Sequence, residues 1–172
     1  FRDKLGVNSN FFSYPFGEYS LEFTEIIRSL NFKYAFGQHS GVIDETKDFF
    51  ELPRFPINEK YGDLERFKTV IKTLPLKFKY ILPKEKYLTA SKNPPVVKIK
   101  FYENIKNIDQ INCYSNEGNT WRESEVVFLD TLNIEIRLRE KFLGERGRIN
   151  CSVREDNGFW RWLGIQFVLA EE

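Results

Sequence analysis

Residues 132–138 read LNIEIRL, and this short stretch decides the fold of the second half of the chain. Apolar and polar residues alternate along it, which is typical of a β-strand with one face in a core and the other toward water. Similar runs recur around it, separated by Asn, Gly and Asp turns, at 96–102, 110–114, 125–129, 148–153 and 160–169. This spacing predicts a small antiparallel β-sandwich over residues 94–172.

The first part of the chain has a different pattern, in which strands alternate with helices. The runs 11–14 and 33–36 predict two short buried strands, and residues 51–57 a third extended piece whose prolines favour a sheet edge. Between the first two strands, Ser20 is a suitable N-cap for an amphipathic helix with apolar residues at positions 23, 26, 27 and 30. The alternation predicts an α/β unit with a parallel sheet.

A second helix is predicted after Asp63, a suitable N-cap. Its apolar positions 64, 67, 70, 71 and 74 fall on one face, and the pattern ends at Pro75. Residues 78–93 are then rich in Lys, Tyr and Pro and lead into a Pro-Pro pair that excludes helix. We therefore expect an α/β unit over residues 1–77, a linker over 78–93 and an all-β domain over 94–172.

Composition excludes several classes of protein. The 172 residues carry 26 basic and 25 acidic side chains, a formal charge of +1, which argues against nucleic acid as the main partner. No apolar run approaches the roughly 18 residues of a membrane span. Met is missing even at position 1, so we expect a fragment or a processed chain. His39 is the only histidine, which leaves few ways to build a zinc site.

The two cysteines both fall in predicted strands of the sandwich. A bridge between Cys113 and Cys151 would stabilise the fold by about 3 to 4 kcal/mol in an oxidising compartment. Two buried thiols are the alternative, and the sequence leaves the choice open.

A Pro-aromatic-Gly turn, Pro15-Phe16-Gly17, follows the first predicted strand and precedes the first predicted helix. In parallel sheets this end of a strand is where ligands bind, and such a turn can aim backbone N–H groups at them. An ordinary strand-to-helix turn is the alternative interpretation.

Segment 12–19, taken in order with segments 34–41, 52–58 and 63–67, resembles the polysaccharide deacetylase (NodB homology) family. The resemblance covers roughly residues 1–75 and matches the second half of that domain. It implies the second half of a distorted (β/α) barrel followed by a β-sandwich accessory domain, and metal-dependent hydrolysis of acetyl groups from N- or O-acetylated sugars. A periplasmic or other extracytoplasmic location is then favoured over a cytoplasmic one.

The family's metal ligands and catalytic base belong to motifs that precede this segment. The resemblance therefore implies a divalent, zinc-like metal held by residues outside this chain, and a fragment that is inactive alone. Two departures from the family pattern stand out. Ser13 or Tyr14 replaces the Arg that often opens the third motif, and the closing Leu-x-His that supplies the catalytic acid is absent.

The resemblance assigns three candidate catalytic residues. The backbone N–H of Phe16 would stabilise the tetrahedral oxyanion, His39 would act as the acid, and Arg54 would orient a carboxylate or bind substrate. A loop histidine and a structural salt bridge are the alternatives for the last two. The candidate sugar contacts in this part of the chain are Tyr14, Pro15, Gly17, Glu18 and Tyr19.

The second half of the chain concentrates aromatic and arginine side chains. Trp160 and Trp162 share a face of the last predicted strand, and we expect at least one of them to be a core residue. The other aromatic residues of the group are Trp121 and Phe159, and the arginines are Arg148, Arg154 and Arg161. Aromatic rings stack on sugars, although large aromatic side chains more often pack in a core. The alternative to the deacetylase is thus a non-catalytic carbohydrate-binding or structural β-sandwich module, and in either case the expected partner is a polysaccharide or oligosaccharide.

Overall fold

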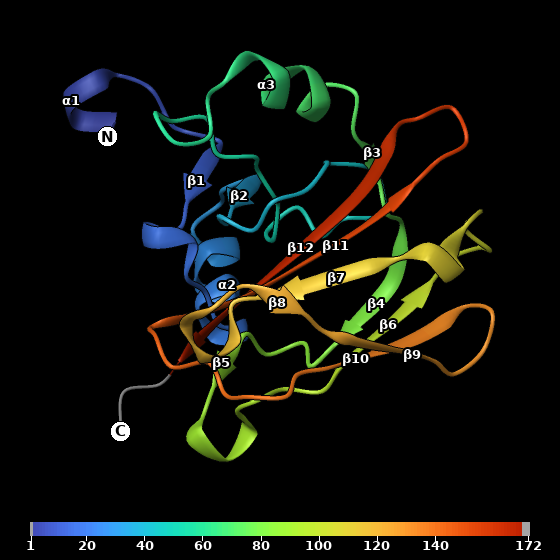
Figure 1. The fold of residues 1–172 in the computed structure, drawn as a ribbon. Coiled ribbons are helices and arrows are strands. Elements are labelled where there is room, and N and C mark those ends of the chain that lie inside the picture. The colour runs from blue at the N-terminus through green and yellow to red at the C-terminus, as the bar shows by residue number, and fades with distance from the viewer. Residues whose placement is uncertain (1, 170–172) are drawn as a thin grey trace.

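Two facing β-sheets form the larger part of the structure, a computed structural model that describes residues 2–169 (Figure 1). One sheet has the order β4-β6-β10-β9, with β4 Phe78–Leu82, β6 Val97–Phe101, β10 Asn133–Arg137 and β9 Glu125–Phe128. The other has the order β3-β12-β11-β7-β8, with β3 Leu74–Pro75, β12 Trp160–Leu169, β11 Arg146–Arg154, β7 Asn112–Ser115 and β8 Arg122–Glu123. The short β5, Tyr87–Leu88, also pairs with β12.

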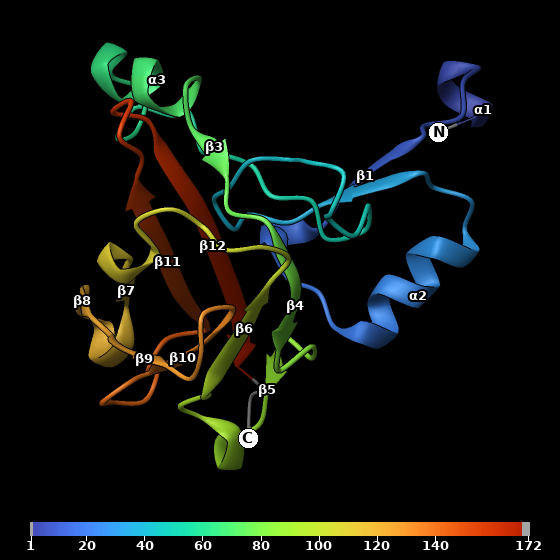
Figure 2. The same ribbon diagram turned by 90° about the vertical axis from the view of Figure 1, so that its right-hand side faces the viewer.

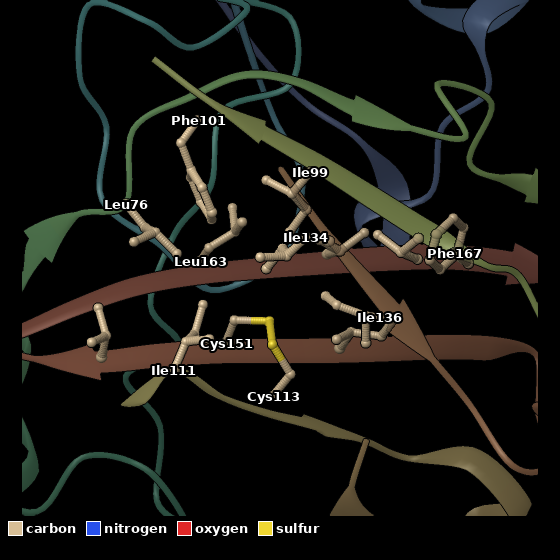
Figure 3. Close-up of a cluster of buried hydrophobic side chains, with 14 of the residues drawn as sticks. Leu76, Ile99, Phe101, Ile111, Cys113, Ile134, Ile136, Cys151, Leu163 and Phe167 are labelled. Carbon is tan, nitrogen blue, oxygen red and sulfur yellow. A yellow bond between two sulfur atoms is a disulfide. The ribbon is translucent and has the colours of Figure 1, made fainter. Parts of the chain in front are cut away.

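The core of the sandwich lies between these sheets because the strands alternate as their sequences predict. Ile134 and Ile136 of β10 are buried, and so are Ile149, Cys151 and Val153 of β11. Leu163, Ile165 and Phe167 of β12 complete the same layer, as Figure 3 shows for the labelled side chains. The residues between them on β11 and β12 point away from the core.

A disulfide joins Cys113 to Cys151, which answers the question that the sequence left open. The two residues lie directly opposite each other in the β7–β11 register, and both are fully buried (Figure 3). The bond links positions 38 residues apart and therefore restricts the unfolded chain as well as the folded sheet.

The first part of the chain forms a small βαβ unit to one side of the sandwich (Figure 2). Strand β1, Phe11–Ser13, pairs in parallel with β2, Tyr34–Phe36, and helix α2, Leu21–Ser29, connects them. The Ser20 side chain caps α2 by accepting a hydrogen bond from Phe23 N at 3.1 Å. The unit has its own small core, made by Tyr14, Tyr19, Ile27, Ala35 and Phe50.

The half-barrel expected from the resemblance is wrong. Within residues 2–169 the parallel sheet has two strands, extended by a bridge between Phe36 and Leu52, and does not close into a barrel. Helix α3, Leu64–Val70, begins after its Asp63 cap as predicted, but its apolar face is not covered, because Leu64 is 64% and Ile71 is 61% exposed. The helical spacing correctly gave an apolar face but could not show whether anything packs on it.

Residues 78–93, expected to be a linker, instead carry β4 and β5 of the sandwich. Phe78 and Ile81 of β4 pack against its core, which is why this Lys-rich segment is ordered in a sheet. The remaining short elements are helix α1 and four 3-10 turns: α1 Arg2–Leu5, η1 Pro15–Gly17, η2 Ala90–Lys92, η3 Ile108–Gln110 and η4 Glu117–Asn119. None of the helices in the described part of the chain has the length and apolar character needed to cross a membrane.

The βαβ unit meets the sandwich along β12. Gly41 forms an antiparallel bridge with Leu163 at the edge of that strand. On the outward face of β12, the side chain of Gln166 donates to the carbonyls of Phe16 and Gly17 at 3.3 and 3.2 Å. Gly164 permits a close approach, since a Cβ there would lie 2.3 Å from the Ser40 carbonyl oxygen. The outward face of β11 and β12 is therefore partly covered, and the uncovered part borders a groove.

Candidate binding groove

A groove of about 810 Å³ lies between the outward face of β11 and β12 and the segment 54–69. We call it the aromatic groove and define it by its aromatic and arginine side chains, which are Phe55, Tyr61, Trp121, Trp162, Arg54, Arg66 and Arg148. Its volume is within the range of small-molecule sites in proteins. These side chains come from four separate parts of the chain: segment 54–66, Trp121, β11 and β12.

Trp162 forms a fixed part of the groove. Its Nε1 donates to Ser40 Oγ at 2.9 Å, and that hydroxyl donates to Asn150 Oδ1 at 2.7 Å. Phe55 packs edge-on against the indole, with ring centroids 6.0 Å apart. Because its polar atom is satisfied and its ring is packed, the indole is preorganised and loses little conformational freedom when a ligand binds.

Trp121 provides a more open ring, since 51% of the residue is exposed. The turn η4, which precedes Trp121, is fixed by hydrogen bonds to residues 140 and 141. The buried carboxylate of Glu117 accepts a hydrogen bond from Glu140 N at 2.8 Å, and Gly118 N donates to Lys141 O at 2.9 Å. A large, accessible aromatic ring on an anchored turn is suited to stacking against an apolar ligand face.

Arg148 supplies a half-buried charge to the groove. Its Nε donates to Gln166 Oε1 at 3.3 Å, and Gln166 is its register partner on β12. Burial lowers the pKa of Arg148, the charge of Arg146 lowers it further, and Tyr61 opposes both. The guanidinium nevertheless stays protonated, as arginine does throughout proteins.

A second, smaller cavity of about 350 Å³ lies on the other side of His39. Its lining carries charges of both signs, including Lys47, Lys86, Asp48 and Glu51. Burial lowers the pKa of Lys86 and raises that of Glu51, and the charges of these two residues act in the opposite direction on each other. Lys79 and Lys84 also line this cavity, so it carries charges of both signs with lysines in excess.

His39 lines both cavities as a neutral ring. Burial lowers its pKa to about 3, and the charges of Lys86 and Lys47 act in the same direction. Its Nδ1 is buried and has no hydrogen-bond partner among the described residues. An imidazole with this pKa holds no extra proton near pH 7, so it does not suit the general-acid role expected for it.

The other candidate sugar contacts of the βαβ unit do not line the aromatic groove. Tyr14 is a core residue, 1% exposed, whose hydroxyl donates to Phe50 O, so it cannot contact a sugar. Gly17 is packed against Gln38, and Glu18 forms an ion pair with Arg146. Tyr19 is buried and borders the smaller cavity.

Phe16 and Pro15 lie at the contact with the sandwich. Phe16 has a positive φ of 54°, its carbonyl accepts from Gln166, and the Arg146 guanidinium lies 5.0 Å from its ring centroid. Pro15 is exposed beside it. The turn thus connects the βαβ unit to β12.

Of the candidate residues, His39, Arg54 and Trp162 come together in the aromatic groove. Trp160 points to the same outward face as Trp162 but lies outside the groove, with the Arg154 guanidinium 5.7 Å from its ring centroid. The sequence reasoning missed Phe55, Tyr61 and Arg66. No local motif marks them, because each belongs to the groove through a fold contact between distant segments.

The described residues offer few ligands for a metal ion. Within residues 2–169, no group of three or more His, Cys, Asp or Glu side chains is placed to hold a metal ion. Both cysteines are used in the disulfide, and the lone His39 has a buried ring. The donor set of this part of the chain therefore does not fit a metal centre.

Comparison with known proteins gave no family model that matches the chain and no match among curated proteins. Similar solved structures include PcoC, a methionine-rich copper resistance protein from Escherichia coli, at 14% identity and a TM-score of 0.39, covering 56% of this chain and 100% of that one. The selenomethionine form of PcoC gives 12% identity and a TM-score of 0.38, covering 55% and 99%. Because both TM-scores lie below 0.5, this likeness carries no argument about the function of the chain.

These findings overturn the resemblance to polysaccharide deacetylases. No family model matches the chain, and the described residues form no barrel. The expected deacetylase activity, the hydrolase class and the zinc-like metal that followed from the resemblance lose their basis with it. The β-sandwich of the alternative interpretation is what the structure contains.

Proposed function

We propose that this protein is a carbohydrate-binding β-sandwich module that acts by binding rather than by catalysis. One observation carries the proposal: the preorganised ring of Trp162 and the exposed ring of Trp121 line the same groove, next to arginine and amide side chains. Sugar rings present apolar faces for stacking and hydroxyls for hydrogen bonds, and this lining offers partners for both.

An extracytoplasmic location is consistent with the covalent structure. The Cys113–Cys151 disulfide is of the kind that persists in oxidising compartments. A periplasmic or secreted setting, where polysaccharides are accessible, is therefore part of the proposal.

The test is a fluorescence titration of the protein with neutral and acidic oligosaccharides. The chain has three tryptophans, and two of them, Trp121 and Trp162, line the groove, so their fluorescence should change when a ligand binds there. We expect saturable quenching with at least one oligosaccharide, and a loss of about 5- to 30-fold in affinity in Trp121→Ala, since stacking on one ring contributes roughly 1 to 2 kcal/mol.

Trp160→Ala is the matched control because Trp160 lies on the same outward face but outside the groove. It should leave the affinity within about 2-fold of the unchanged protein. If no oligosaccharide gives saturable quenching, or if Trp160→Ala weakens binding as much as Trp121→Ala, the proposed function is wrong.

A further inference from the structure

The charge of the aromatic groove is one-sided. Arg54, Arg66 and Arg148 line it, whereas no Asp or Glu does so among the residues that the structure describes. The smaller cavity differs because acidic and basic side chains share its lining. The chain as a whole has a formal charge of only +1, so the excess in the groove is local. A lining of one sign favours a ligand of the opposite sign.

The groove arginines also differ from five of the arginines elsewhere in the structure. Arg139 and Arg154 lie outside the groove and likewise have no carboxylate within 4.0 Å among the described residues. A carboxylate lies within 4.0 Å of each of five others, which are Arg28, Arg122, Arg137, Arg146 and Arg161. Within residues 2–169, no carboxylate lies that close to Arg54, Arg66 or Arg148. A guanidinium presents five donors in a planar fork that matches carboxylate and sulfate oxygens, and these three guanidinium groups have no such partner among the described residues.

Arg148 is the most constrained of the three. It is half-buried on β11, and its Nε contact with Gln166 leaves the terminal guanidinium nitrogens for other partners. Arg54 is exposed and comes directly after the buried Leu52 and Pro53. Its backbone N–H donates to His39 O at 3.0 Å. A partly desolvated cation without a counter-charge is costly, so an anion that enters the groove gains from pairing with it.

We propose that the aromatic groove selects acidic sugars: a carboxylate or sulfate ester is bound by Arg148 and Arg54 while a sugar ring stacks on Trp121 or Trp162. This inference rests on the proposed carbohydrate-binding function and adds the charge of the ligand. A carboxylate and a sulfate ester each present at least two terminal oxygens that a guanidinium can bind at the same time. Sugars with a carboxylate and sugars with a sulfate ester are therefore tested separately.

The experiment compares matched oligosaccharides by calorimetry and tryptophan fluorescence at fixed ionic strength. One arm uses an oligogalacturonate and its fully methyl-esterified form, which differ in charge and little in shape. The other uses a sulfated galactan oligosaccharide and its desulfated form. We expect at least one charged form to bind 10-fold or more tighter than its neutral counterpart, and the arm in which this happens identifies the anion.

Arginine variants then test where the anion binds. Arg54→Gln and Arg148→Gln should each weaken binding of the charged form by about 10- to 100-fold and leave the neutral form within about 3-fold. Arg154→Gln is the control, since it removes the same charge from β11 at an exposed position outside the groove. It should change the affinity by less than about 2-fold.

Two results would overturn the inference while keeping the proposed function: equal affinities for the charged and neutral forms, or tighter binding of the neutral ones. A loss in Arg154→Gln as large as that in Arg54→Gln would also overturn it, because attraction would then be general rather than local. Absence of binding by every oligosaccharide, charged or neutral, would reject the proposed function and the inference with it. Circular dichroism of each variant checks that it is folded.

Discussion

The two faces of the β11–β12 ribbon carry side chains of different character. Alternate residues of the same two strands form one face and the other. The inward face presents Ile149, Cys151 and Leu163 to the sandwich core. The outward face presents Arg148 and Trp162, which line the aromatic groove beside the βαβ unit. Because side chains alternate strictly along a strand, one ribbon supports the core of the sandwich with one face and lines the groove with the other.

The largest effect should come from the inward face. Ile149→Ala removes a side chain with 0% exposure, and we expect it to lower the free energy of unfolding by about 2 to 5 kcal/mol because a cavity remains in the core. Urea unfolding of the oxidised protein measures the change. Ser152→Ala, on the outward face of the same strand, should stay within about 0.5 kcal/mol. Equal losses in the two variants would show that the faces do not differ as described.

An intermediate effect is expected where the βαβ unit covers the outward face. Gly164→Ala would place a methyl group 2.3 Å from the Ser40 carbonyl oxygen, so the covering loop must move. We expect a loss of about 1 to 3 kcal/mol and a shift in the emission of Trp162, which bonds to Ser40. Gly144→Ala is the control, because a methyl group there meets only Asn119 Oδ1 at 3.6 Å. An unchanged Gly164→Ala protein would mean that the loop does not rest on β12.

The smallest effect should come from the ion pair between Glu18 and Arg146, which joins the βαβ unit to β11. Both side chains are partly exposed, at 29% and 26%, so we expect a coupling energy of no more than about 1 kcal/mol. A double-mutant cycle with Glu18→Gln and Arg146→Gln measures it. The more exposed pair Lys68–Glu65 on α3 should give less, and a larger value for that pair would contradict the ranking by exposure.

The sequence predicted the strands of the sandwich better than the surroundings of the groove. Alternation located β10 and β12, and the Ser20 and Asp63 caps located the starts of α2 and α3. Periodicity depends on near neighbours, so it holds within one element. It failed for β4, whose pairing with β6 is a tertiary contact, and for the exposed apolar face of α3.

The groove could be predicted only in part for the same reason. Trp162 and Arg54 were visible as chemistry-bearing residues, but Phe55, Tyr61 and Arg66 join them through contacts between segments that are distant in sequence. Short motifs also misled the interpretation of the first 75 residues. Their order resembled half of a barrel, whereas a two-stranded parallel unit with its own core satisfies the same apolar positions.

The Cys113–Cys151 bond has one more consequence. Strand β7, which carries Cys113, continues through η4 toward Trp121, and Cys151 lies on the strand that carries Arg148. The bond therefore links the strand that leads to Trp121 with the strand that carries Arg148. Reduction of the disulfide would remove this covalent link, so binding of the proposed ligand should weaken when the protein passes from an oxidising to a reducing environment.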